Sequence, residues 1–461
     1  MISVITLTSR ISLIILLAFY TLTCFGTLFI FKYRLGQKVL YFFQTFAMYM
    51  ILINGAFVIY LNSSDDRILF MTLALALLFI ISRYIFTGII NGANQGILNN
   101  MCLFLTVSFL EMVRLDFSKA ARQLIFAYIS LIIALVGVLI LRNIKVLKEL
   151  WLFYACIGIL LLIVVTLTGA TEYGAKLSIK IGSISLQPAE FVKLSLVFFI
   201  AAVLYKSNCF KNVLLVTAVA AIHVLILVAS KDLGTAFVFL MTYIVMLFIA
   251  TGNYFYLLIT ISGSGFAGYL ALKLFPHIQT RFLAWRDPLS VVDDQGYQIS
   301  QSLFAIGTGG WMGTGLYQGS PLKIPVVTKD FIFAAIAEEF GCFFALFLIF
   351  VCISTFLNIF KVAVNLKDRF FRLVTTGFGT VYVVQTFLNI GGVIKYIPST
   401  GVTLPFISYG GSSLLSCMIM FSIVLSVYEI TGQNLNDRKE NNKRKNKSDF
   451  EEHYRLPVEE L

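Results

Sequence analysis

Long apolar runs separated by short polar connections extend along almost the whole sequence. A helix needs roughly 20 apolar residues to cross a bilayer, and twelve runs meet or approach that length. They lie at about residues 11–31, 39–61, 68–90, 124–141, 150–170, 190–205, 212–230, 233–250, 254–275, 330–357, 373–394 and 405–430. A thirteenth run, at 101–115, is shorter and carries Glu111 and Arg114. The pattern predicts an all-α polytopic membrane protein with twelve or thirteen spans.

The distribution of basic residues decides between these two counts. Lys and Arg concentrate in cytoplasmic connections, which fixes the orientation of the helices. The most basic connections, at about 32–38, 142–148, 206–211 and 361–372, and the basic tail share one side of the membrane only if 101–115 also spans. The sequence therefore predicts thirteen helices, an extracytoplasmic N-terminus and a cytoplasmic C-terminus.

The composition supports this class and excludes several others. Hydrophobic residues make up 59% of the chain and charged residues 13%, whereas soluble proteins average about 45–50% and about 25%. The net charge of +12 resides in the connections and the tail, which suits anionic lipid headgroups and gives no nucleic-acid site. The seven Cys include no CxxC pair, and the three His show no metal-ligand spacing.

Two connections on the predicted outer side are too long and too polar to be simple turns. They cover residues 169–190 and 276–329, and long connections of this kind are usually functional. They and the connection near 395 carry cations on the side that should be poor in them, namely Lys176, Lys180, Arg281, Arg286, Lys323, Lys329 and Lys395. The polar tail at 433–461 is expected to be disordered.

The second long connection contains three candidate catalytic carboxylates, Asp287, Asp293 and Asp294, in WRDPLSVVDDQGYQ. Such a carboxylate can remove a proton from a sugar hydroxyl, or it can cap a turn, and the spacing leaves both roles open. Asp293 and Asp294 are neighbours whose mutual repulsion favours a base at neutral pH. We therefore rank these two ahead of Asp287, which precedes a proline.

Charged residues at the edges of apolar runs are costly and are candidates for function. Glu190 and Lys193 are three residues apart and share a helix face, as a buried structural ion pair or as part of a site. Asp232 in SKDLGT, Asp330 in KDFIFA and Glu338 in IAEEFG occupy comparable positions. The segment LPFISYGGSSLL includes Ser412 and Ser413 and suits close helix packing or an anion at a helix start.

Five of these segments together resemble the SEDS family of shape, elongation, division and sporulation proteins, which includes FtsW, RodA and SpoVE. They are QPAEFVKL (187–194), KDLGTA (231–236), GYQISQSLFAIGTGG (296–310), DFIFAAIAEEFG (330–341) and TGVTLPFISYGGSSLL (400–415). The resemblance implies a ten-helix core at 101–432, to which residues 1–100 add about three helices. It also implies polymerisation of lipid II into peptidoglycan on the outer face of the bacterial cytoplasmic membrane, in cell shape, division or sporulation.

The reaction implied by the resemblance sets out the roles expected of a site. A loop aspartate would deprotonate the acceptor hydroxyl, cations would stabilise the undecaprenyl diphosphate that leaves, and a divalent cation could share that charge. The implied partners are a class B penicillin-binding protein, lipid II and membrane lipids. The residues expected to bind substrate are Lys176, Glu190, Lys193, Asp232, Arg286, Gln298, Asp330, Glu338, Ser412 and Ser413.

The chain departs from the family pattern at two positions. An ungapped alignment on Asp287 and Gly296 places Val291 where the family generally carries its catalytic Asp, and Ser178 stands where the family often has Trp. These departures favour an alternative, a non-catalytic scaffold that binds a penicillin-binding protein. A third hypothesis, a flippase for a lipid-linked precursor, would need a polar path through the bilayer, whereas the polar motifs concentrate on one side.

Overall fold

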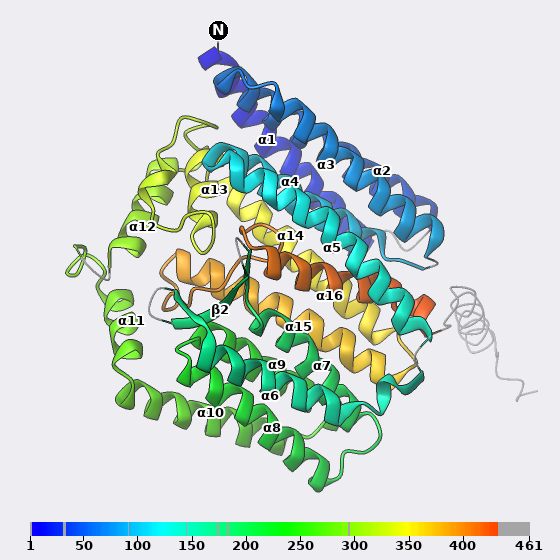
Figure 1. Ribbon diagram of the computed structural model, residues 1–461. Coiled ribbons are helices and arrows are strands. Elements are labelled where there is room, and N and C mark those ends of the chain that lie inside the picture. The colour runs from blue at the N-terminus through cyan, green and yellow to red at the C-terminus, as the bar shows by residue number, and fades with distance from the viewer. Residues whose placement is uncertain are drawn as a thin grey trace, which may run out of the picture.

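The protein is a bundle of long helices in the computed structural model, which describes residues 2–30, 34–90, 92–143, 145–172, 175–181, 184–293 and 296–431 (Figure 1). The predicted tail at 433–461 and Asp294 lie outside these residues. Twelve helices in the described residues are long and apolar enough to cross a membrane. They are α1 (Ile2–Phe25), α2 (Arg34–Ser63), α3 (Arg67–Arg83), α4 (Gln95–Leu115), α5 (Phe117–Asn143), α6 (Trp151–Thr168), α8 (Phe210–Ala229), α9 (Leu233–Thr251), α10 (Tyr254–Leu274), α14 (Cys342–Val364), α15 (Arg369–Val393) and α16 (Gly411–Ile430).

The remaining elements are shorter. Helix α7 (Ala189–Leu204) has 16 residues and corresponds to the apolar run at 190–205, which is one of the thirteen spans predicted from the sequence. Helices α11 (Pro276–Arg286), α12 (Tyr297–Gly309) and α13 (Ile332–Phe340) belong to the long connection between α10 and α14. The all-α class is confirmed. The additions to the predicted elements include α11 and α12 and a small antiparallel sheet after α6, of order β1-β2-β3, formed by Ala170–Glu172, Ala175–Ile181 and Ile184–Leu186.

Helices α4, α7 and α15 form the interior of the bundle. Every residue in the apolar window of α4 is buried, and α7 is buried except at Phe191 and Ser195. Helix α7 packs against α6, α9 and α15, whereas α10 has no buried residue and packs on α9 and α11. Polar side chains on the interior helices must find partners within the protein, because the hydrocarbon core supplies none.

Polar residues fix where several helices begin. Asn94 accepts hydrogen bonds from the amides of Gly96 and Ile97 at the start of α4, at 3.0 and 3.3 Å. Asp368 caps α15 in the same way, and Asp232 accepts the Thr235 amide at the start of α9. A side-chain oxygen at this position satisfies an amide that has no partner within the helix.

The chain between 330 and 357 was predicted to be one helix, and the structure divides it into α13 and α14 at Gly341. Gly341 has a φ of +93°, which residues other than glycine rarely adopt. A Cβ there would lie 2.3 Å from the amide nitrogen of Gly313. The segment after α12 therefore packs directly on the break, where the amide of Cys342 donates to the carbonyl of Gly310 at 2.9 Å.

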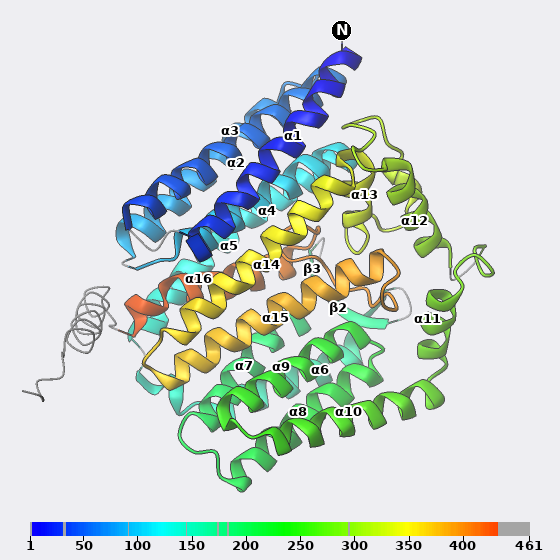
Figure 2. The same ribbon diagram turned by 180° about the vertical axis from the view of Figure 1, so that it is seen from behind.

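Figures 1 and 2 show which segments lie at each end of the bundle. The start of α1 lies at the end that carries α12 and α13, where Arg10 donates to the carbonyl of Gly313 at 2.6 Å. The end of α16 lies at the opposite end of the bundle. The two long predicted connections thus occupy one end together, as expected if they share one side of the membrane.

Helices α1, α2 and α3 form an N-terminal unit that packs along α4 and α14 (Figure 2). A buried amide joins them to the rest of the bundle. Asn100 on α4 accepts a hydrogen bond from the Tyr20 hydroxyl of α1 at 2.9 Å. Its amide nitrogen donates to Ser354 and Thr355 of α14, at 3.0 and 2.9 Å.

We expect Asn100→Ala to destabilise the protein by about 1–2 kcal/mol, because it leaves the buried Tyr20 hydroxyl without its acceptor. Thermal unfolding of the full chain in detergent measures this loss. The matched control is Asn62→Ala, since Asn62 is only half-buried and donates within its own helix to the carbonyl of Val58. Equal losses in the two variants would contradict a joining role for Asn100.

Candidate functional site

A buried ion pair stands at the start of α7. Glu190 lies in the first turn of the helix, and Lys193 follows three residues later on the same face. The ammonium of Lys193 lies 2.5 Å from Oε2 of Glu190, and the two residues are 3% and 8% exposed, respectively. An ion pair in this environment is stable only if its remaining donors and acceptors are also satisfied.

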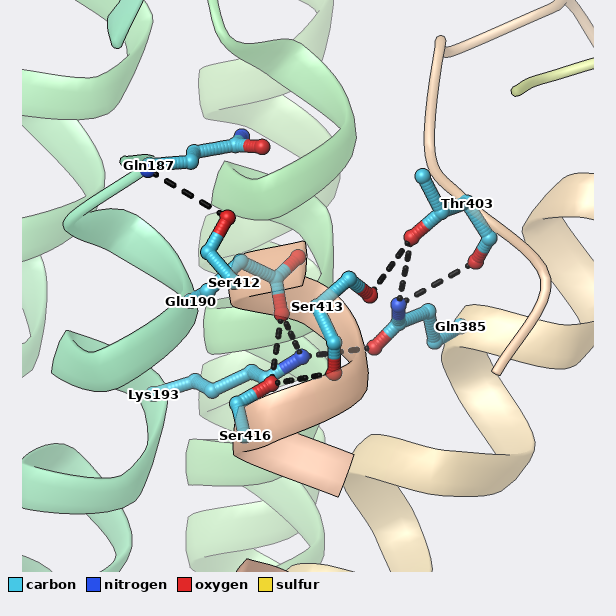
Figure 3. Close-up of polar contacts among 8 residues, drawn as sticks. All are labelled: Gln187, Glu190, Lys193, Gln385, Thr403, Ser412, Ser413 and Ser416. Carbon is cyan, nitrogen blue, oxygen red and sulfur yellow. Dashed lines mark hydrogen bonds and ion pairs between the residues drawn. The ribbon is translucent and has the colours of Figure 1, made fainter. Parts of the chain in front are cut away.

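Side chains from α15 and α16 provide those partners (Figure 3). Lys193 donates to Oε1 of Gln385 on α15 at 3.0 Å, and the Ser416 hydroxyl of α16 donates to Glu190 at 2.8 Å. The amide of Gln385 donates to the carbonyl of Thr403, whose hydroxyl lies 2.9 Å from the hydroxyl of Ser413. We call these six residues the polar network: Glu190, Lys193, Gln385, Thr403, Ser413 and Ser416.

A second group of charged residues adjoins the network, and we call Asp232, Arg281 and Asp330 the charged cluster. Asp232 caps α9 with Oδ1, while its Oδ2 is buried and accepts no hydrogen bond from the described residues. Arg281 on α11 is half-buried and donates to the carbonyl of Ser399 at 3.2 Å. Asp330 precedes α13, and its main-chain carbonyl accepts the amide of Asn389 at 2.9 Å.

Burial and mutual charge control the ionisation of the cluster, which lies outside the twelve long helices. Burial raises the pKa of Asp232, and the nearby Glu190 carboxylate raises that pKa further. Burial also raises the pKa of Asp330 to about 6, against the opposing influence of Lys329 and Arg281. Burial lowers the pKa of Arg281, whereas the two aspartates raise it. The carboxylates of Glu190 and Asp232 therefore link the polar network and the charged cluster electrostatically.

The connection between α15 and α16 holds the two groups together. Asn389 donates to the carbonyls of both Asp330 and Val402, so α15 fixes the connection beside the cluster. Gly234 at the start of α9 allows the connection to pass close by, since a Cβ there would lie 2.3 Å from a methyl group of Val402. The hydroxyl of Ser408 donates to the carbonyl of Lys329 at 2.5 Å.

The predicted catalytic loop lies between α11 and α12 and projects away from the bundle in both views (Figures 1 and 2). Asp287 is exposed, and its carboxylate accepts the Ser290 amide at 3.3 Å, which is the turn-capping role left open by the sequence. Asp293 is exposed on the same loop. Val291 is half-buried and closes the loop through a hydrogen bond from the Gly296 amide at 2.9 Å.

Other residues predicted to bind substrate lie at several places. Lys176 is in β2, opposite Thr171 of β1. Arg286 is exposed in the last turn of α11, and Gln298 is half-buried in the first turn of α12. The hydroxyl of Ser412 accepts the Gln187 amide at 3.3 Å, next to the polar network (Figure 3).

Glu338 belongs to a separate buried group. Its Oε1 accepts the Ser320 amide at 2.8 Å, and its neighbour Glu339 pairs with Arg114 of α4 at 3.0 Å. Glu111 of α4 is fully buried beside them, and neither of its carboxylate oxygens has a hydrogen-bond partner in the described chain. Burial raises the pKa of Glu339 to about 7, even though Arg114 lowers it. No group of three or more His, Cys, Asp or Glu among the described residues is arranged to hold a metal ion.

Several members of the site were not predicted as site residues, namely Arg281, Gln385, Asn389, Thr403 and Ser416. A signal existed for Gln385 and Asn389, which are uncharged polar residues four apart within an apolar run. Polar residues at such positions usually face the interior of a helical bundle. Arg281 stood out in the sequence as one of the cations on the predicted outer side, which suit the diphosphate that leaves.

We expect Glu190→Gln and Lys193→Met each to cost about 3–5 kcal/mol, because each leaves one buried charge without its partner. The charge-swapped double variant, Glu190→Lys with Lys193→Glu, should recover part of that loss. Thermal unfolding in detergent of the parent, the two single variants and the double variant Glu190→Gln with Lys193→Met gives the coupling energy of the pair.

The control for this cycle is Lys206→Met. Lys206 lies 4.0 Å from Glu149, and both side chains are more than half exposed, so its loss should be close to zero. A coupling below about 0.5 kcal/mol between Glu190 and Lys193 would mean that the two residues act independently.

The geometry can be compared with known proteins. A family profile described as FtsW/RodA/SpoVE cell cycle protein matches residues 95–432. Peptidoglycan glycosyltransferase RodA of Mycobacterium tuberculosis is 34% identical over 272 residues, which cover 56% of this chain and 58% of that protein. Stage V sporulation protein E of Bacillus subtilis is 34% identical over 330 residues, which cover 68% of this chain and 87% of that protein. The match thus spans less than two thirds of the mycobacterial relative.

Solved structures share the fold. A chain of a peptidoglycan synthase complex superposes with a TM-score of 0.63 at 23% identity, over 74% of this chain and 99% of that one. Rod shape determining protein RodA of Thermus thermophilus gives 0.54 at 23% identity, over 73% and 97%. The profile covers most of the chain and agrees with the multi-pass helical architecture. The chain is therefore a multi-pass membrane protein that belongs to the FtsW/RodA/SpoVE family of cell cycle proteins.

Proposed function

We propose that this protein is a peptidoglycan glycosyltransferase that polymerises lipid II at the cytoplasmic membrane. The observation that supports this most directly is the family match over residues 95–432, together with relatives named peptidoglycan glycosyltransferase RodA. Lipid II carries a disaccharide-pentapeptide on undecaprenyl diphosphate. Its polymerisation requires a base for the acceptor hydroxyl and positive charge for the diphosphate that leaves.

The site at one end of the bundle contains both kinds of group. Lys329 and Arg281 lie near the two aspartates of the charged cluster. Lys193 supplies a further cation in the adjoining polar network. A cation stabilises a leaving diphosphate most strongly in a site that excludes water. We assign the charged cluster to the reaction, and the polar network to positioning the helices around it.

We further propose a partner and an orientation. The partner is a class B penicillin-binding protein, a proposal supported by the fold shared with a chain of a peptidoglycan synthase complex described as coordinating polymerization and crosslinking. The end that carries α11–α13 faces outward, and the end of α16 faces the cytoplasm. The basic connections between helices support this orientation through the retention of Lys and Arg in the cytoplasm.

A second candidate function is a non-catalytic scaffold that binds the same partner and the lipid-linked precursor. It is favoured by Val291, which replaces the Asp expected in the loop between α11 and α12. The two candidates differ in one measurable property, the formation of glycan polymer.

The full chain, purified together with the class B penicillin-binding protein of its own organism, should convert labelled lipid II into glycan polymer that is resolved on a gel. The transpeptidase of the partner is blocked with a β-lactam, so that any polymer reports chain extension alone. The partner without this chain is the control and should give none. A complex that binds lipid II but yields no polymer would establish the scaffold instead.

Reporter fusions should place residues 34 and 433 on the cytoplasmic side, because thirteen helices put the end of α1 and the end of α16 on the same face. Paired phosphatase and fluorescent reporters at each position give the measurement, with a fusion in the connection between α10 and α14 as the outward-facing control. Opposite results at the two positions would contradict the count of thirteen.

A further inference from the structure

Asp330 interacts with charged neighbours through its carboxylate but caps no backbone amide with it in the described chain. It is half-buried and accepts no hydrogen bond there, while its main chain is fixed by Asn389. Asp232 and Asp287 differ, because each uses a carboxylate oxygen to cap a backbone amide. Asp293 differs in another way, since it is exposed on the projecting loop and is not shielded from water.

The surroundings of Asp330 include a glycine and a buried carboxylate oxygen that has no partner in the described chain. The carboxylate lies beside Gly401, where even an added Cβ would be 3.6 Å from Oδ2, an ordinary contact distance. Gly401 has a φ of +74°, so the backbone itself favours a residue without a side chain here. Next to Asp330, the second carboxylate oxygen of Asp232 is buried and unpartnered. A buried acceptor without a protein donor is uncommon in native structures, and a water, an ion or a substrate hydroxyl can satisfy it.

The charges around Asp330 come from three elements. Lys329 precedes it on the same segment, Arg281 approaches from α11, and Asp232 approaches from the start of α9. Farther out, His277 of α11 faces Lys231 and Arg281. Burial raises the pKa of Asp330, the two cations partly offset that rise, and the same cations suit an anionic leaving group.

We propose that Asp330 is the general base of the polymerisation, in place of the aspartate that this chain lacks at Val291. The proposal rests on the glycosyltransferase function proposed above. A carboxylate oxygen of Asp330 takes the proton of the acceptor sugar hydroxyl, and the hydroxyl oxygen forms a bond to C1 of the donor sugar. The bond between C1 and the diphosphate oxygen breaks, and its electron pair leaves with the lipid diphosphate beside Arg281 and Lys329. The loop aspartates Asp287, Asp293 and Asp294 then have no direct part in proton transfer.

Asp330→Asn should lower kcat for lipid II polymerisation by at least about 100-fold while KM changes little, because a positioned general base contributes about 10²–10⁴-fold. The measurement uses the full chain with its class B partner and labelled lipid II. The matched control is Asp65→Asn, another half-buried aspartate, which pairs with Arg67 in the connection between α2 and α3 and should keep the parent rate. Thermal unfolding of each variant confirms folding.

The pH profile separates a base from a purely structural residue. In the parent, kcat should fall as the pH is lowered through about 6, because the protonated carboxyl of Asp330 cannot accept a proton. Arg281→Gln should move this limb to higher pH, since it removes a cation that lowers the pKa of Asp330. This shift keeps the proposal testable even if Asp330→Asn fails to fold.

Two outcomes would overturn the proposal and leave the proposed function intact. One is a parental rate in Asp330→Asn, and the other is loss of polymerisation in a single Asn variant of Asp287, Asp293 or Asp294 while Asp330→Asn remains active. A parent chain that makes no polymer with a competent partner would overturn the proposed function and, with it, the role of Asp330.

Discussion

The arrangement of the site depends on one buried cation, the ammonium of Lys193. An ammonium within a helical bundle is stable only when oxygen atoms surround it, because the low-dielectric interior offers no water to take their place. Glu190 supplies one oxygen from the same helix, and Gln385 supplies another from α15. Ser416 then brings α16 to Glu190. Helix α7 and the consecutive helices α15 and α16, which lie far from it in the sequence, are thereby fixed around one charge.

The connection between α15 and α16 extends this constraint to the surface of the bundle. Its backbone receives hydrogen bonds from Gln385, Asn389 and Arg281, so helices α11 and α15 both determine its path. Asp330 lies against that path and is bound through its main chain by the same Asn389. The main chain of an aspartate outside the long helices is consequently fixed by α15, while its carboxylate caps no backbone amide in the described chain.

The N-terminal unit adds a contact that the matched family region does not contain. The profile begins at residue 95, and helices α1–α3 precede it. Arg10 of α1 nevertheless reaches the carbonyl of Gly313, in the segment that packs against the break between α13 and α14. The extra helices therefore support the same end of the bundle as the candidate site, through hydrogen bonds and not through packing alone.

The length of the apolar runs and the distribution of basic residues predicted the long helices of this protein, because an apolar run long enough to cross a membrane has few alternatives to a helix. The sequence also singled out Glu190, Lys193, Asp232 and Asp330, since charge beside such a run is costly and therefore conspicuous. Only the tertiary structure determined the contacts between segments that are distant in the sequence. Gly341 divides a segment that the sequence predicted as one helix because another segment packs on it, and the sequence does not record that contact. Likewise, Arg281 and Asp330 are about fifty residues apart in the chain. They belong to one cluster only because α11 packs against the connection before α16 in the folded protein.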